Sequence, residues 1–267
     1  MTHDNLLQPL LEIAREAAAR ILEIYGREFT VEHKEDASPL TEADRASHAA
    51  IVRGLAALTP DIPVLSEESA AVPPAERRRW DTFWLVDPLD GTKEFIQRNG
   101  EFTVNIALVQ EGRPIAGLVH VPVSGESYLA CAGVGAFHLN ARGERSVLRV
   151  APLGAGPIRV VGSRSHRGEL LDAYLARLGP HTLVSMGSSL KLCLVAAGKA
   201  DVYPRLGPTF EWDTAAAQCV VECAGGQVIA CDTGEPLRYN RRDTLVNPFF
   251  IAYGDPRGDW LRHLQAN

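Results

Sequence analysis

Cysteine is scarce in this 267-residue chain, and its five cysteines form an odd, scattered set without any Cys-x-x-Cys pair. That pattern does not indicate a disulfide framework, and we expect buried, reduced thiols in a reducing cytosol. Cys219 and Cys223, four residues apart on a predicted helix, share a face, but no further Cys or His ligand for a soft metal lies close to them in the sequence.

Long apolar runs are also missing. No uninterrupted apolar stretch of about 18 residues occurs, so we expect no transmembrane segment. Near the N-terminus, Glu12 and Arg15 interrupt the apolar residues, which argues against a secretory signal.

An excess of positive charge is the third absence. The 27 Lys and Arg residues face 33 Asp and Glu residues, giving a formal net charge of −6. A protein that binds nucleic acid polymers normally carries a basic excess, so that class is disfavoured. A small anionic ligand remains compatible, provided that a local cationic pocket or a metal ion receives it.

What the sequence does contain is typical of a folded globular enzyme. Hydrophobic residues make up 46% and charged residues 22%, which argues against disorder and coiled coils. A chain of this length can bury roughly three quarters of its unfolded surface, as one large domain or two modest ones.

The first half begins with helical patterns. Apolar residues recur at helical spacing from 6 to 25, and a second helix is predicted from 41 to 58 with Thr41 as its N-cap. Short buried strands are expected at 63–65 and 82–86. Between 102 and 139, β-rich runs separated by turn residues predict an antiparallel meander.

The second half alternates strands and helices. Residues 152–157 are rich in Pro and Gly and form the best linker candidate. The later elements are expected as strands at 158–161, 182–185 and 227–230 and helices at 169–178, 189–197 and 214–224. The pattern predicts an α/β protein with an N-terminal half (1–150) and a C-terminal half (151–267).

The chemically informative segment is Asp87-Pro88-Leu89-Asp90-Gly91-Thr92, directly after an apolar strand. Two carboxylates at a strand end suit a hard divalent cation, and the backbone N–H groups of Gly91 and Thr92 suit an anion such as phosphate. The alternative is an ordinary turn, because Asp, Pro and Gly dominate turns for local reasons.

Two further acidic segments favour the metal interpretation. Glu67, beside Glu68, follows the preceding strand, and Asp213 opens a helix in the second half. If the segments converge, Glu67, Asp87, Asp90 and Asp213 share one cleft, and their mutual repulsion would require bound cations or raised pKa values. The alternatives are a solvated loop for Glu67-Glu68 and a plain helix cap for Asp213.

These three segments, at their spacing, resemble the motifs of the inositol-monophosphatase-like superfamily of metal-dependent, lithium-sensitive phosphatases. The resemblance spans nearly the whole chain and implies a layered α-β-α-β-α sandwich with the site between the halves. Within the superfamily, the run from Gly91 to Leu108 is similar to the bacterial 3′(2′),5′-bisphosphate nucleotidases of the CysQ type. The Asn-Phe and His-x-x-Pro that inositol monophosphatases usually carry after Gly-Thr are replaced here by Glu94-Phe95 and Arg98-Asn99-Gly100.

The resemblance implies a metal site and a catalytic pair. The implied Mg²⁺ ligands, for two or three ions per site, are Glu67, Asp87, the backbone carbonyl of Leu89, Asp90 and Asp213. Asp44 would pair with Thr92 and orient the attacking water, with Glu67 also counted among the catalytic residues. From the residues alone, Asp44 also fits as a first-turn residue of the second helix, favoured by the helix dipole.

The resemblance also implies a substrate site, drawn mostly from the second half. Its residues are Gly91, Thr92, Ser163, His166, Gly187, Ser188, Lys191, Arg205 and Asp213. Lys191 is the best candidate to bind a 5′-phosphate, with Arg205 as a second cation. The alternatives are a solvated helix residue for Lys191 and a loop or capping residue for His166.

The implied reaction is hydrolysis of the 3′-phosphate of adenosine 3′,5′-bisphosphate to AMP and phosphate. The sulfated form, 3′-phosphoadenosine 5′-phosphosulfate, is a second expected substrate. Inositol monophosphate and fructose 1,6-bisphosphate remain alternative substrates. We expect a cytoplasmic enzyme, and peripheral attachment to the inner membrane, which occurs in related proteins, stays open.

Overall fold

The computed structural model describes residues 6–33, 39–69, 71–163 and 168–264. The helices are α1 (Leu7–Tyr25), α2 (Glu42–Leu58), α3 (Pro74–Arg77), α4 (Thr92–Ile96), α5 (Glu169–Leu178), α6 (Leu190–Ala196) and α7 (Glu211–Cys223), followed by the 3₁₀ turns η2 (Pro256–Gly258) and η3 (Trp260–Leu264). Among the described residues, no helix is both long and apolar enough to cross a bilayer.

The strands form a small hairpin and two larger sheets. The hairpin pairs β1 (Val31–His33) with β2 (Pro39–Thr41). The seven-stranded sheet follows chain order: β3 (Val64–Ser66), β4 (Thr82–Asp90), β5 (Thr103–Gln110), β6 (Arg113–His120), β7 (Ser127–Cys131), β8 (Gly135–Leu139) and β9 (Arg145–Val147). The five-stranded sheet has the order β11 (His181–Met186), β10 (Ile158–Ser163), β12 (Val202–Arg205), β14 (Phe250–Tyr253) and β13 (Gln227–Ala230).

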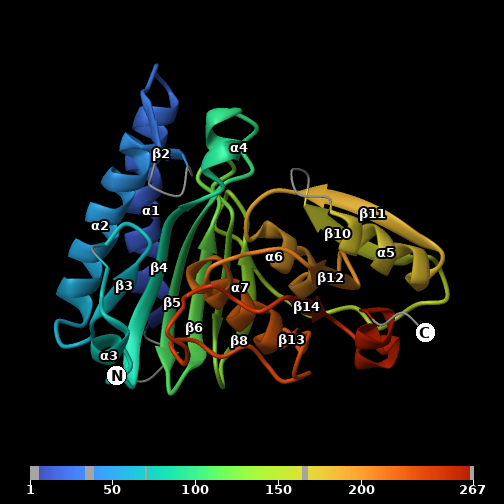
Figure 1. The fold of residues 1–267 in the computed structure, drawn as a ribbon. Helices are drawn as coiled ribbons and strands as arrows, with labels where there is room; N and C mark the ends of the chain where they lie inside the picture. The colour runs from blue at the N-terminus through green and yellow to red at the C-terminus, as the bar shows by residue number, and fades with distance from the viewer. Residues whose placement is uncertain (1–5, 34–38, 70, 164–167, 265–267) are drawn as a thin grey trace.

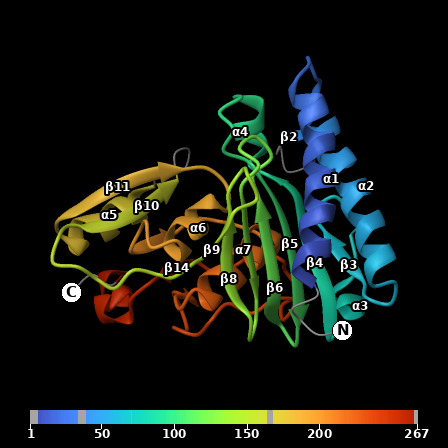
Figure 2. The ribbon, with the colours of Figure 1, turned by 180° about the vertical axis from the view of Figure 1, so that it is seen from behind.

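Five layers stack around the two sheets. Helices α1 and α2 cover one face of the seven-stranded sheet, and α6 and α7 lie between the two sheets (Figures 1 and 2). Helix α5 and η3 cover the outer face of the five-stranded sheet, packing with residues such as Val160 and Ile251. The predicted α-β-α-β-α sandwich is therefore confirmed.

The central layer is built by close approach of α7 to the seven-stranded sheet. Gly117 on β6 leaves the space: a Cβ there would lie 2.3 Å from the backbone oxygen of Ala216 and 2.8 Å from the Cβ of Cys219. Helix α7 comes from the second half yet packs on the sheet of the first half, so one hydrophobic core contains residues from both. The division near residue 150 stays a prediction.

Most predicted elements are present, and the differences are local. The meander predicted between 102 and 139 is confirmed by β5 to β8, which pair antiparallel in chain order. None of the five cysteines forms a disulfide; Cys131, Cys193 and Cys219 are buried, as expected, whereas Cys223 and Cys231 are only partly buried. The helix expected from residue 214 begins three residues earlier, at Glu211, because the Asp213 side chain caps its first turn. The hairpin of β1 and β2, and strands β9, β12 and β14, were not predicted.

Candidate functional site

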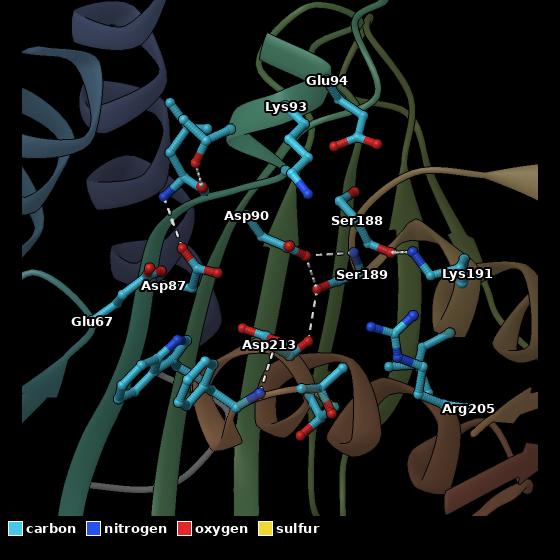
Figure 3. Close-up of a pocket in the computed structure, with 18 of the residues that line it drawn as sticks. Glu67, Asp87, Asp90, Lys93, Glu94, Ser188, Ser189, Lys191, Arg205 and Asp213 are labelled. Carbon is cyan, nitrogen blue, oxygen red and sulfur yellow. Dashed lines mark hydrogen bonds between the residues drawn. The ribbon is translucent and has the colours of Figure 1, made fainter. Parts of the chain in front are cut away.

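A pocket of about 270 Å³ lies where the ends of β3 and β4 meet α4 and the N-termini of α6 and α7 (Figure 3). It contains ten of the residues expected at the site: Glu67, Asp87, Leu89, Asp90, Gly91, Thr92, Ser188, Lys191, Arg205 and Asp213. The three acidic segments, far apart in the sequence, therefore converge as the sequence predicted.

The other three predicted substrate residues are not among those that the structure places in the pocket lining. Gly187 is not among the pocket-lining residues; its backbone N–H donates to Glu101 Oε2 at 2.8 Å. Ser163 is the last residue of β10. His166 lies outside the described residues.

The Asp87–Asp90 corner is a bulge at the end of β4. The strand was expected to stop at Val86 but continues to Asp90, and its register against β5 shifts between the two aspartates. A bulge tolerates Pro88, which cannot donate to a sheet ladder. Asp87 Oδ1 accepts a hydrogen bond from the Leu89 N–H at 3.0 Å, which fixes the carboxylate inside the bulge.

Asp90 is held by Asn105 on β5 and by Ser189, the N-cap residue of α6. Its Oδ2 accepts hydrogen bonds from the N–H and hydroxyl of Ser189, both at 2.6 Å, and from Asn105 Nδ2 at 3.4 Å. The Ser189 hydroxyl also lies 2.8 Å from the backbone oxygen of Asp213, so Ser189 links two of the acidic segments. Sequence analysis missed Ser189 and Asn105, although Ser189 follows two predicted substrate residues directly.

Asp213 and Asp44 each combine capping with a place at the site. Asp213 Oδ2 accepts from the N–H of Phe210 at 2.9 Å, so the helix-cap interpretation is correct while the residue also lines the pocket. Asp44 accepts from the N–H and hydroxyl of Thr41 in the capping box of α2. Its other oxygen accepts from the Thr92 hydroxyl at 3.3 Å, which is the pairing that the resemblance implied.

The acidic residues leave a strongly negative corner. Burial, followed by the charges of Glu67, Asp90 and Asp213, raises the pKa of Asp87 well above its ordinary value. Burial and the charge of Asp90 raise the pKa of Asp213 in the same way. Such a corner gains most from a cation.

The donors suit a hard divalent cation but do not form a closed cage. Carboxylate oxygens and the Leu89 carbonyl are the ligands that Mg²⁺ prefers, and Figure 3 shows the Glu67 and Asp87 carboxylates beside each other. In the described parts of the chain, no three acidic, His or Cys side chains are arranged to hold an ion by themselves. Mg²⁺ sites normally keep several water or phosphate oxygens, so an open donor set fits this ion.

Lys191 and Arg205 line the side of the pocket away from Glu67 and Asp87 (Figure 3). Lys191 is buried, and its Nζ donates to the Ser188 carbonyl at 2.6 Å. Burial lowers its pKa. Arg205 Nη2 donates to the Pro208 carbonyl at 2.7 Å, while its buried Nε has no hydrogen-bond partner in the described structure. Lys93, which the sequence analysis did not single out, points from α4 into the pocket (Figure 3).

An aromatic pair completes the lining. The rings of Phe210 and Trp212 stack with centroids 5.1 Å apart and planes 11° apart. Neither ring was predicted as a site residue, although Trp212 directly precedes Asp213.

The comparison with known proteins identifies the family of this chain. The family model for the inositol monophosphatase family matches residues 3–257. The chain belongs to the inositol monophosphatase family. Members of this family are metal-dependent phosphatases.

Within the inositol monophosphatase family, several similar relatives are nucleotidases. A curated 3′(2′),5′-bisphosphate nucleotidase CysQ of Salmonella typhimurium is 47% identical over 249 residues, which cover 92% of this chain and 98% of that protein. The crystal structure of CysQ from Bacteroides thetaiotaomicron has a TM-score of 0.83 at 43% identity, covering 95% of this chain and 98% of that one. An inositol monophosphatase from Anabaena shares the fold, with a TM-score of 0.77 at 24% identity and coverage of 99% and 96%. The resemblance noted from the motifs is confirmed.

Proposed function

We propose that this protein hydrolyses the 3′-phosphate of adenosine 3′,5′-bisphosphate, giving AMP and phosphate, with Mg²⁺ as cofactor. The sulfated nucleotide is a second proposed substrate, with its 3′-phosphate as the group removed. Support comes from the nucleotidase relatives and from the division of the pocket into an acidic and a cationic part.

The observation that carries the proposal is that division. A substrate with two separate phosphate groups can place one at the Asp87–Asp90 corner and the other near Lys191 and Arg205. A monophosphate on a neutral ring has no charged group for the second position. The geometry therefore favours a bisphosphate over inositol monophosphate, and the nucleotidase relatives favour a nucleotide over a sugar.

The proposed ligands of Mg²⁺ are the carboxylates of Glu67, Asp87, Asp90 and Asp213 and the Leu89 carbonyl, for two or three ions. When bound, Mg²⁺ supplies positive charge that neutralises the phosphate and the leaving oxygen and activates a water molecule for attack.

The chain's own groups would orient the reaction. Because the Thr92 hydroxyl donates to Asp44, its lone pairs are available to accept a hydrogen bond from the attacking water. Asp44 is nearly fully buried, and burial is the largest influence raising its pKa, so it is suited to receive a proton passed along this pair. The water oxygen forms the new bond to phosphorus, the bond from phosphorus to O3′ breaks, and the departing O3′ takes up a proton.

Substrate binding is assigned to the other predicted residues. The N–H groups of Gly91 and Thr92 would face the scissile phosphate, and Lys191, Arg205 and Ser188 the 5′-phosphate. Ser163, His166 and Gly187 remain proposed nucleotide contacts. A cytoplasmic location and lithium sensitivity likewise remain predictions for this chain.

A phosphate-release assay tests the proposal. With Mg²⁺, we expect kcat/KM to be highest for adenosine 3′,5′-bisphosphate among a panel that includes the sulfated nucleotide, inositol 1-phosphate, fructose 1,6-bisphosphate and a dinucleotide. Added Li⁺ or a chelator should suppress turnover. A higher kcat/KM for either sugar phosphate, or equal turnover of the dinucleotide, would contradict the assignment.

The proposed binding of the 5′-phosphate by Lys191 is tested with two substrates that differ only in that phosphate. Adenosine 3′-monophosphate lacks only the 5′-phosphate, so the wild type should prefer the bisphosphate. In Lys191→Ala this preference should shrink, because kcat/KM falls for the bisphosphate more than for the monophosphate. An unchanged preference would remove Lys191 from the 5′-phosphate site.

A further inference from the structure

One face of α2 contacts all the segments that bring acidic residues from the first half to the pocket. Asp44, Ser47 and His48 are at positions i, i+3 and i+4, so their side chains project from one side of the helix. Asp44 pairs with Thr92, as described above. Ser47 and His48 each reach a different segment, and neither lines the pocket itself.

His48 reaches the turn that carries Glu67. Its Nδ1 lies 2.9 Å from the hydroxyl of buried Ser66. That hydroxyl accepts the N–H of Glu68 at 3.4 Å, while the Ser66 carbonyl accepts the N–H of Ser69 at 3.0 Å. Together with the bond from the Glu67 N–H to the Val86 carbonyl at 3.1 Å, these hydrogen bonds hold the turn around Glu67, and the Ser66 side chain is one of the groups that fix it.

Ser47 reaches the bulge that carries Asp87 and Leu89. Its hydroxyl, fully buried, donates to the Pro88 carbonyl at 2.7 Å. Pro88 has no N–H, so its carbonyl is the one backbone group through which the bulge can be tied at this residue. The bond therefore fixes the peptide between the Asp87 carboxylate and the Leu89 carbonyl.

We propose that Ser47 and His48 are positioning residues for the metal site, and that α2 sets the spacing between the Glu67 turn, the Asp87 bulge and Thr92. This inference rests on the proposed magnesium-dependent function. Groups that orient metal ligands commonly change metal affinity 10- to 100-fold when they are removed. The contacts near Lys191 and Arg205 lie on other elements and should be unaffected.

A role in packing alone predicts something different. Helix α2 is anchored to the sheet layer by buried apolar residues, among them Ala50, Ile51 and Leu55. If Ser47 and His48 only assisted that packing, their loss would lower the melting temperature of the metal-free protein and leave the dependence on Mg²⁺ as it was.

The test is a double-mutant cycle on the full-length protein. The apparent Kd for Mg²⁺ is measured without substrate, from the rise in melting temperature during a Mg²⁺ titration, for wild type, His48→Leu, Ser66→Ala and the double variant. We expect each single variant to raise the Kd about tenfold, and the double variant to be no more than about twofold weaker than either, because both remove the same contact. The KM for the nucleotide at saturating Mg²⁺ should stay within about twofold of wild type.

Two matched controls make the result specific. His48→Asn keeps a side-chain nitrogen near the Nδ1 position and should restore most of the Mg²⁺ affinity. Arg53→Ala removes an exposed ion pair with Glu16 elsewhere on α2 and should titrate like wild type. Should His48→Leu fold poorly, Ser66→Ala and Ser47→Ala carry the test, each with an expected rise in Kd of about tenfold.

The outcomes separate the two proposals. If wild type responds to Mg²⁺ and hydrolyses the bisphosphate while the variants titrate like it, or their effects simply add, the positioning role is wrong and the function stands. If wild type neither gains stability from Mg²⁺ nor releases phosphate, the proposed function and the inference that rests on it both fall.

Discussion

Asp90 and Thr92 are the two residues on which the chemistry of the pocket depends most directly. Asp90 Oδ2 is occupied by hydrogen bonds from Ser189, which leaves Oδ1 to face a cation. We expect Asp90→Asn and Thr92→Ala each to lower kcat by about 100-fold or more, as loss of a metal ligand or of a positioned proton acceptor usually does. Steady-state phosphate release under saturating Mg²⁺ measures the effect.

Circular dichroism and thermal melting of the same two variants show whether the fold is retained. Wild-type rates in both variants would mean that the active residues lie elsewhere.

Glu211 gives a second prediction at this scale. It is fully buried, its Oε2 accepts the Asn240 N–H at 2.7 Å, and its Oε1 has no partner in the described structure. Burial raises its pKa to about 7 from an ordinary 4.5. A carboxyl whose pKa is higher in the folded state stabilises most below its unfolded pKa, and that stability is lost as the pH rises through 7.

The Glu211→Gln variant should therefore lose less stability than wild type as the pH rises. Between about pH 5 and pH 8, we expect the difference in unfolding free energy to shift by about 2 kcal/mol in favour of the variant. Urea denaturation at both pH values gives the number. A difference that stays constant with pH would show that Glu211 does not titrate in this range.

Several single-residue roles were predictable and others were not. The Asp87–Asp90 segment alone fits a metal site or an ordinary turn, and the Glu67 and Asp213 segments together with the family resemblance favoured the metal site. Other roles depend on contacts between residues far apart in the sequence. Ser47 contacts Pro88, 41 positions away, and Ser189 contacts Asp90, 99 positions away. His48 contacts Ser66, 18 positions away. Such pairings depend on tertiary packing, which local spacing does not encode.

At the scale of elements, the close packing of α7 on β6 decides where Asp213 lies. A Cβ at Gly117 would lie 2.3 Å from the Ala216 backbone oxygen, so Gly117→Ala must push the helix away. Overpacking against a backbone costs more than a clash with a flexible side chain, and we expect a loss of about 3 kcal/mol in unfolding free energy. Mg²⁺ affinity should fall as well, because Asp213 moves with α7.

Chemical denaturation of Gly117→Ala, with Gly154→Ala as control, tests this packing. No atom lies within 4 Å of a Cβ at Gly154, so that variant should keep or slightly increase its stability. Equal stabilities of the two variants would contradict the described packing.

Helices and strands were predictable where a single residue pattern, such as apolar periodicity, dominated the segment. Helices α1 and α2 follow from apolar periodicity and a Thr41 cap, whereas β12 was missed because Pro204 lies inside it. The strand tolerates this proline because β12 pairs with β10 only at Val202. The extension of β4 through its bulge was missed for a similar reason, since Asp and Pro are typical of turns.

For the whole molecule, the account predicts that metal binding and proton release are linked. Burial and neighbouring carboxylates raise the pKa values of Asp87 and Asp213 in the metal-free protein. Mg²⁺ binds the ionised carboxylates and competes with protons for them, so its apparent affinity should weaken as the pH is lowered. Isothermal titration at several pH values, in buffers of different ionisation enthalpy, would show the released protons. A Kd independent of pH would contradict the electrostatics described here.

The layered architecture was predictable as a whole through the resemblance, and its family is confirmed. Periodicity alone indicated only two α/β halves. It could not show that α7 of the second half completes the core of the first, because that depends on which faces meet in three dimensions.

The most direct measurement is a crystal structure of the protein grown with Mg²⁺ and phosphate. We predict electron density for at least one cation contacted by Asp87, Asp90 and Asp213 together, with the phosphate beside it in the same pocket. A well-ordered structure in which Asp213 points away from the other two aspartates, and no cation is bound among them, would contradict the account.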